Sequence, residues 1–259
     1  MPFKAIAIPV MDTVNVILTH QPAAAVSRMV AYWNNHVQAG SILLAYGGSR
    51  DEYDRIEHPQ KFYVQDPRLQ TRDHQREFQS YTTLLAMAAD FLRANRSGTE
   101  FVHFAEYDHL PLAQDLNRRQ IERLRSERAD VLGYHLQRVD GTSYPHSLYH
   151  VSNPQFRDFW RGITRRSSPQ VILSMFGSGS FWKREAFMAV AGCKEPFPMY
   201  MEIYLPTLAH HLGFRLRDFG EQNAFVHNLG DRTNTIEQAG QLGAWTLHPV
   251  KKLWERAGS

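Results

Sequence analysis

The sequence contains a single cysteine, Cys193, in 259 residues. One thiol excludes an internal disulfide, and no Cys-x-x-Cys or mixed Cys/His spacing for structural zinc can be built around it. A reducing compartment fits best, so we predict a cytoplasmic protein. HExxH and HxH pairs are absent although there are 13 histidines, and so are the GxxxxGK[ST] and GxGxxG patterns. These absences count against metal-dependent hydrolases, P-loop enzymes and dinucleotide-binding enzymes.

The chain also lacks a large excess of charge and a long hydrophobic run. Its 29 basic and 26 acidic side chains give a net charge of +3, which is too small and too dispersed for a nucleic-acid-binding protein. Pro9, Asp12 and Asn15 interrupt the first apolar run, so we expect no signal peptide and no spanning helix. The last residues carry basic groups around Leu253 and Trp254, which fits either a docked terminal helix or peripheral contact with the inner face of a membrane.

Short apolar runs alternate with stretches of helical periodicity along the first half of the chain. Strands are predicted at 14–19, 41–46, 61–64 and 100–105, and helices at 22–37 and 78–94. In the second half the pattern predicts helices at 112–128, 153–161, 184–190 and 204–212, and a strand at 131–136. Alternation of this kind indicates βαβ units. We therefore predict one α/β domain over residues 1–259, with a Rossmann-like, mostly parallel central sheet flanked by helices.

An acidic pair directly follows the fourth predicted strand in the segment FVHFAEYDHLPL. Glu106 and Asp108 should lie at the carboxyl edge of the sheet, where α/β proteins bind ligands. Two carboxylates that project to the same side can hold a divalent cation. The arrangement resembles the Asp-x-Asp motif of GT-A glycosyltransferases, which binds Mn²⁺ or Mg²⁺ and the donor diphosphate. Glu106 stands where Asp is commonest, so Asp108 is the stronger candidate ligand; the alternative is a solvated acidic turn.

The segment PMYMEIYLPTLAHHLGFRL resembles a second motif of inverting GT-A enzymes, an acidic residue followed by an apolar helix and a glycine. Counting back from Gly213 aligns Leu205 with the leucine of the motif and Glu202 with its general base. A carboxylate at this position would take the proton of the acceptor hydroxyl. Met201 stands where the motif usually has a further acidic residue.

The segment GSGSFWKREAF resembles the glycine-rich loop that shapes the sugar pocket in the same family. The resemblance implies sugar or acceptor contacts from Gly179, Ser180 and Trp182, together with Tyr200. The alternative from the residues alone is a flexible turn with Trp182 in the core.

A late histidine often completes the metal site of GT-A enzymes, and neutral imidazole suits Mn²⁺. His227, in AFVHNLGD, is the preferred candidate from the order of the motifs, and His248, in TLHPVKK, is the rival.

Polar residues that follow the predicted strands of the first half are candidates for the nucleotide site. They are Thr19, His20 and Gln21 after the first strand, Ser49 and Asp51 after the second, Asp66 after the third, and Arg72 and His74 in the basic run before the next helix. The alternative for that basic run is a salt-bridged surface loop.

The resemblance implies a glycosyltransferase (EC 2.4) that moves a sugar from a nucleotide-diphosphate donor, most commonly a UDP-sugar, to a saccharide or lipid-linked acceptor in polysaccharide biosynthesis. Residues of about 1–110 would bind the nucleotide and about 111–259 the acceptor. Inversion is the favoured stereochemistry and retention stays open. A non-catalytic nucleotide- or glycan-binding protein and a sugar nucleotidyltransferase are the alternatives.

Overall fold

The computed structural model describes residues 12–66, 74–144, 154–193, 200–220, 225–228 and 234–250. Arg72 and the basic C-terminal residues after Val250 lie outside these ranges. Within the part of the chain that is described, no helix is both long and apolar enough to cross a membrane.

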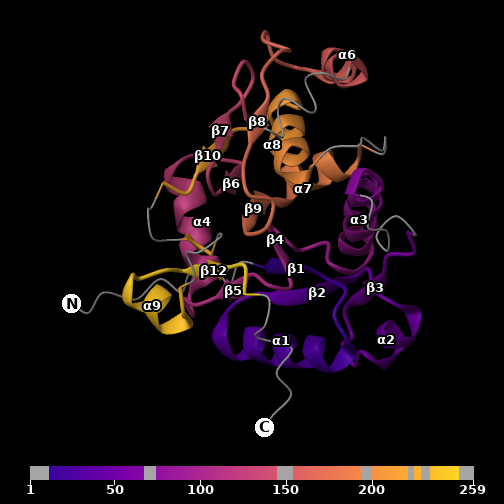
Figure 1. Cartoon of the computed structure of the whole chain (residues 1–259), viewed down its shortest axis with the longest axis vertical. Coiled ribbons are helices and arrows are strands. Elements are labelled where there is room, and N and C mark those ends of the chain that lie inside the picture. The colour runs from indigo at the N-terminus through magenta and orange to yellow at the C-terminus, as the bar shows by residue number, and fades with distance from the viewer. Residues whose placement is uncertain are drawn as a thin grey trace, which may run out of the picture.

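A seven-stranded sheet forms the centre of the molecule, in the order β10-β6-β9-β4-β1-β2-β3 (Figure 1). Its neighbours pair in parallel except β9, which runs antiparallel to both β4 and β6. The strands are β1 Thr13–Thr19, β2 Ser41–Tyr46, β3 Lys61–Tyr63, β4 Phe101–Glu106, β6 Val131–Gly133, β9 Ser180–Lys183 and β10 Leu216–Asp218. Because β1, β2 and β4 are parallel neighbours, their carboxyl ends meet at one edge, and the polar residues that follow them are brought together.

Helices cover both faces of this sheet. Alternate side chains of β1 point to opposite faces: Val14 and Val16 pack with α3, α7 and α8, whereas Ile17 packs with α1. Figure 1 shows α1 on one side of the sheet and α3, α7 and α8 on the other. The helices are α1 Ala23–His36, α2 Arg50–Arg55, α3 His74–Asn95, α4 Leu116–Ser126, α6 Pro154–Ile163, α7 Arg184–Ala191, α8 Met201–His211 and α9 Ile236–Gln241.

A smaller sheet brings the C-terminal part of the chain to the acidic pair. It has the order β11-β12-β5 and contains β5 Leu110–Pro111, β11 Phe225–His227 and β12 Thr246–His248. β12 pairs antiparallel with β5, so that Leu247 lies opposite Leu110. The Val250 amide then donates to the Asp108 carbonyl at 2.9 Å. A third, two-stranded sheet pairs β7 Gln137–Arg138 with β8 Leu173–Ser174.

The predicted α/β class is confirmed, and the local differences include the following. The glycine-rich segment was predicted as a loop, yet Ser180–Lys183 is a central strand because its side chains are apolar enough to lie between β4 and β6. The predicted strand at 131–136 ends at Gly133, since a turn begins at Tyr134. The short helix α2 was not predicted; Ser49 caps it by accepting a hydrogen bond from the Glu52 amide.

Candidate functional site

Glu106 is the last residue of β4, and a tight turn after it carries Asp108 back toward the sheet edge. The Glu106 amide donates to the Ser178 hydroxyl at 3.0 Å. The His109 amide donates to the Glu106 carbonyl at 3.0 Å, which closes the turn. Asp108 is buried, with 6% of its surface exposed. The backbone therefore fixes both acidic residues, and the predicted position of the pair at the carboxyl edge of the sheet is confirmed.

Glu106, Asp108 and His248 form a compact group of possible metal ligands, whose nearest donor atoms all lie within 4.8 Å of one another. Nδ1 of His248 is 3.4 Å from Oδ1 of Asp108, and its Nε2 is 4.0 Å from Oε2 of Glu106. Donor atoms held at about 2.1 Å from one ion are roughly 3 to 4 Å apart. Two carboxylates and one imidazole also form a donor set that suits Mn²⁺. The residues present therefore fit a divalent cation in spacing and in chemistry.

His248, rather than the preferred His227, is the histidine that joins this group. β12 pairs directly with β5, the strand that follows Asp108, whereas β11 and its His227 lie one strand farther out. The ring of His227 is parallel to that of His248, with centroids 6.2 Å apart and an interplanar angle of 6°. Burial and, to a smaller extent, the nearby His248 and His135 together lower the pKa of His227 to about 4. His248 therefore replaces His227 as the candidate metal ligand, and His227 packs against His248 outside the group.

Glu202, the candidate base, lies in the first turn of α8. Pro206 stands four residues later in the same helix and has no N–H to donate to the Glu202 carbonyl. That carbonyl instead accepts a hydrogen bond of 2.9 Å from the Met175 amide. Because Pro206 leaves the Glu202 carbonyl without its usual partner in the helix, this carbonyl can bond to the segment after β8. That hydrogen bond fixes the backbone of Glu202. Burial raises the pKa of the Glu202 carboxyl above its ordinary value, as expected for a group that accepts protons.

Glu202 lines a cavity of about 380 Å³. His227 lines the same cavity, and its ring centroid is 6.2 Å from that of His248 in the group of possible metal ligands. The other lining residues are His135, Gln137, Tyr144, Ser174, Met175 and Phe176. They come from the strands β7 and β8 and from the segments next to them, and no local sequence motif marks them. Their role depends on how these segments meet α8 in the folded chain.

Two of the predicted nucleotide-binding residues, Thr19 and His20, line a second cavity of about 90 Å³ at the end of β1. Glu106 lines it as well, so this cavity adjoins the possible metal ligands. The ring of His20 meets Tyr107 edge-on, with centroids 5.0 Å apart. The backbone amide of the neighbouring Gln21 donates a hydrogen bond to the Thr19 hydroxyl at 3.2 Å. The carboxyl end of β1 therefore lies beside Glu106, and nucleotide contacts from Thr19, His20 and Gln21 stay predictions.

Among the other predicted nucleotide contacts, the described residues Ser49, Asp51 and Asp66 do not line this cavity. The Ser49 hydroxyl caps α2, and Asp51 is exposed in the first turn of that helix. Asp66 is buried after β3, with 7% exposure. His74 begins α3, and its side chain lies outside the described part of the chain, as does the whole of Arg72. Contacts of these residues with a nucleotide stay predictions.

The predicted sugar contacts of Ser180 and Trp182 require correction. Trp182 is 1% exposed and packs in the main core, and its Nε1 donates to the Ser180 hydroxyl at 2.9 Å. Ser180 is fully buried and donates in turn to the Gly177 carbonyl. Neither side chain offers a surface to a ligand, because β9 became an interior strand. Tyr200 is partly buried directly before α8, and a ligand contact from it stays a prediction.

Gly179 has a structural reason to be glycine. Its φ of +85° favours glycine, and a Cβ built there would lie 2.5 Å from Cε1 of His109. The ring of His109 is fully buried beside His103 and His248. Burial lowers the pKa of His109 well below its ordinary value and that of His103 to about 3. Gly179 therefore makes room for a neutral histidine next to the metal-ligand group, and a direct ligand contact from it stays a prediction.

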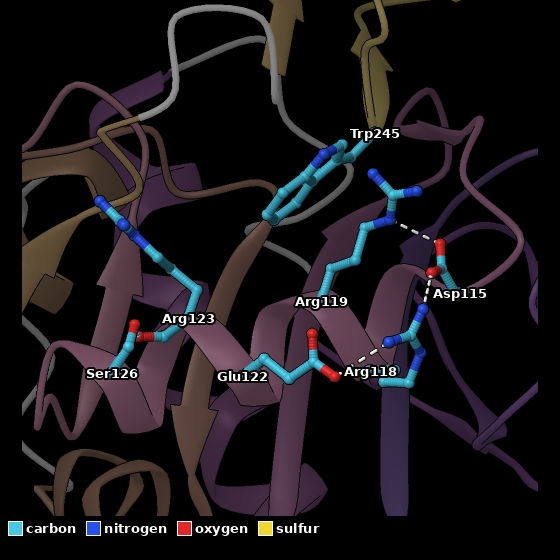
Figure 2. Close-up of a pocket in the computed structure, with 7 residues that line it drawn as sticks. All are labelled: Asp115, Arg118, Arg119, Glu122, Arg123, Ser126 and Trp245. Carbon is cyan, nitrogen blue, oxygen red and sulfur yellow. Dashed lines mark hydrogen bonds and ion pairs between the residues drawn. The ribbon is translucent and has the colours of Figure 1, made fainter.

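A further groove of about 410 Å³ lies along the outer face of α4, and none of the predicted site residues lines it (Figure 2). Its charged groups pair with one another: Asp115 bonds to both Arg118 and Arg119, and Arg118 also bonds to Glu122. The guanidinium of Arg119 lies 5.6 Å from the ring centroid of Trp245. Because its cations are already engaged by neighbouring carboxylates, this groove has the character of a salt-bridged helix surface.

No protein-family model matches this sequence, and no curated protein matches it. Among solved structures, it is similar to core-mannan synthase A from Aspergillus fumigatus in its Mn/GDP form. That likeness covers 84% of this chain and 75% of the other, with 8% identity and a TM-score of 0.42. It is also similar to the apo structure of WbbM, a bifunctional glycosyltransferase. Here the likeness covers 95% of this chain but 47% of WbbM, with 10% identity and a TM-score of 0.47. At these values, function has to be inferred from the residues of this chain itself.

Proposed function

We propose that this protein is a metal-dependent glycosyltransferase of the GT-A type that transfers a sugar from a nucleotide-diphosphate donor to a hydroxyl of a saccharide or glycolipid acceptor. The cavity at the end of β1, of about 90 Å³, would take only part of the nucleotide-sugar donor, and the acceptor would enter the cavity beside Glu202. Residues of about 1–110 and about 111–259 would supply these two halves.

One observation carries the proposal: donor-type cavity, acidic group and base-bearing cavity adjoin one another. Glu106 lines the cavity of Thr19 and His20 and also belongs to the group with Asp108 and His248. His248 stacks on His227, which lines the cavity of Glu202. An inverting sugar transferase needs this order, because the diphosphate must leave on one side of the sugar while the acceptor attacks from the other.

Glu106, Asp108 and His248 would hold Mn²⁺ or Mg²⁺. The ion would supply charge stabilisation for the leaving diphosphate. The chain's own contribution is to fix the backbone of both acidic residues, through the hydrogen bond from the Glu106 amide to the Ser178 hydroxyl and the one from the Val250 amide to the Asp108 carbonyl. His20 and Thr19 would contact the nucleotide at the other end of the same cavity.

Glu202 would take the proton of the acceptor hydroxyl as it attacks the sugar. Its raised pKa makes the carboxylate a stronger base than an exposed glutamate. The hydrogen bond between its backbone carbonyl and Met175 keeps the residue at the cavity wall. Attack assisted by a base on the side opposite the leaving group would invert the configuration at the transferred carbon.

The test is a transfer assay on the full chain with Mn²⁺. UDP- and GDP-sugars would be offered with a panel of p-nitrophenyl glycosides, and released nucleotide diphosphate and product mass would be measured. We expect Mn²⁺-dependent release with at least one donor and acceptor pair, and its loss in Asp108→Ala. Nucleotide binding without turnover on any pair would favour the non-catalytic alternative, and release of pyrophosphate from a sugar phosphate and a nucleoside triphosphate would favour a sugar nucleotidyltransferase.

A further inference from the structure

His135 has a backbone conformation that non-glycine residues rarely adopt. Its φ is +52°, in the left-handed region. Histidine enters this region more readily than most residues, but the conformation still costs free energy relative to glycine. Strain of this kind persists only where the surroundings hold it in place, and an observed outlier is a reason to look for a function.

Both neighbours of His135 are held firmly. The ring of Tyr134 stacks on Phe219 and Phe225, with centroids 4.1 Å and 4.2 Å away. The Leu136 amide donates to Oδ2 of Asp218 at 2.7 Å. Because Tyr134 is packed among aromatic rings and the Leu136 amide is bonded to Asp218, the chain turns sharply at His135.

The side chain of His135 is exposed, unlike its neighbours. Its ring meets Phe176 edge-on at 4.8 Å and lines the same cavity as Glu202. Among the described residues, no hydrogen-bond partner of its ring nitrogens is found. The turn thus presents to the cavity of the candidate base an imidazole whose ring nitrogens have no hydrogen-bond partner in the described part of the chain.

We propose that His135 is an acceptor-binding residue, whose imidazole hydrogen-bonds a hydroxyl group of the saccharide that Glu202 deprotonates. This inference rests on the proposed glycosyltransferase function and deepens it by naming a residue that selects and orients the acceptor. The edge-on contact with Phe176 holds the ring in place, and Gln137 and Ser174 supply further polar groups along the same wall.

The experiment compares His135→Gly and His135→Asn with the wild type. Both replacements tolerate a positive φ, so the fold should keep its thermal midpoint or gain a little. Arg128 provides a matched control, because it is the other described non-glycine residue with positive φ (+49°), and it is exposed at the end of α4, outside the cavity. Initial rates would be measured against the p-nitrophenyl glycoside and the nucleotide sugar separately.

We expect the acceptor KM to rise roughly tenfold in both His135 variants, the loss of about one hydrogen bond. The donor KM and the affinity for nucleotide with Mn²⁺ should stay within a factor of two, and Arg128→Gly and Arg128→Asn should change neither KM. An unchanged acceptor KM in the His135 variants, or a rise confined to the donor KM, would overturn the inference while leaving the transferase proposal intact. No transfer by the wild type on any donor and acceptor pair would overturn both.

Discussion

Replacing Glu202 by Gln should lower the rate of sugar transfer and, at high pH, raise the free energy of unfolding. The side chains have nearly the same size, so no cavity forms. The hydrogen bond that positions residue 202 comes from its backbone carbonyl to Met175 and is unaffected by the substitution. The variant therefore keeps the fold and removes only the ability to accept a proton.

The expected loss of turnover follows from what else lines the cavity. Among its described lining residues Glu202 is the only carboxylate. His227 is a poor replacement base, because burial lowers its pKa to about 4. General-base catalysis contributes about 10² to 10⁴ in rate. We therefore expect kcat to fall by about 10² to 10⁴, which corresponds to about 3 to 5 kcal/mol in the barrier.

The effect of Glu202→Gln on the free energy of unfolding should depend on pH. Because burial raises the pKa of Glu202 in the folded state, the folded protein holds this proton more tightly than the unfolded chain does. The contribution of Glu202 to stability is therefore present at low pH and is lost as pH rises through the raised pKa. Gln has no such cost, so Glu202→Gln should gain stability relative to the wild type as pH increases.

The assay is transfer rate at saturating donor and acceptor, with urea unfolding at pH 5 and pH 8 alongside. Glu122→Gln is the matched control, since this exposed carboxylate lies on α4 outside the cavity and should change neither quantity. A Glu202→Gln rate within tenfold of the wild type would refute the assignment of Glu202 as base. If Glu202→Gln has a lower free energy of unfolding than the wild type at pH 8, the claim that ionising the buried Glu202 carboxyl destabilises the fold would be refuted.

Three further predictions concern the structure around the site. Trp182→Ala should lower the free energy of unfolding by about 3 to 5 kcal/mol in urea titrations, because the ring is buried in the main core; a loss below 1 kcal/mol would contradict its core position. Gly179→Ala should lower the free energy of unfolding by about 1 to 3 kcal/mol, since it combines a positive φ with a clash against His109; an unchanged midpoint in urea would contradict this packing. The pKa of His103 is lowered to about 3, so the unfolded chain binds its proton first as pH falls below about 6.5, and this histidine alone should lower the free energy of unfolding by about 2 kcal/mol between pH 7 and pH 5; the pH-dependent loss of stability in His103→Gln should be smaller than in the wild type by about that amount.

The fold could be predicted from sequence wherever local patterns decide. β2, Ser41–Tyr46, was predicted with its observed bounds, since it is a continuous apolar run between polar residues and glycines. The position of Glu106 and Asp108 followed equally well, because residues after a parallel strand reach the ligand edge of the sheet. β9 could not be foreseen in GSGSF, because the run becomes a strand only through its pairing with β4 and β6.

The site was harder to predict than the fold, because long-range pairing assembles it. His248 meets Asp108 only because β12 pairs with β5, and nothing in the local sequence distinguishes it from His227. The cavity around Glu202 joins segments that are far apart in the chain, and the exposed turn at His135 depends on Asp218. Trp182 was interpreted as a sugar contact from family resemblance, whereas burial decides its role.

The most direct measurement of the central claim is a calorimetric titration of UDP, GDP, CMP and ADP into the protein with and without Mn²⁺. We predict that one nucleotide binds only with the metal, that Asp108→Ala and His248→Ala abolish this binding, and that His227→Ala keeps it. Metal-dependent binding that survives Asp108→Ala and His248→Ala, or no nucleotide binding under any condition, would contradict a nucleotide–metal site at Glu106, Asp108 and His248.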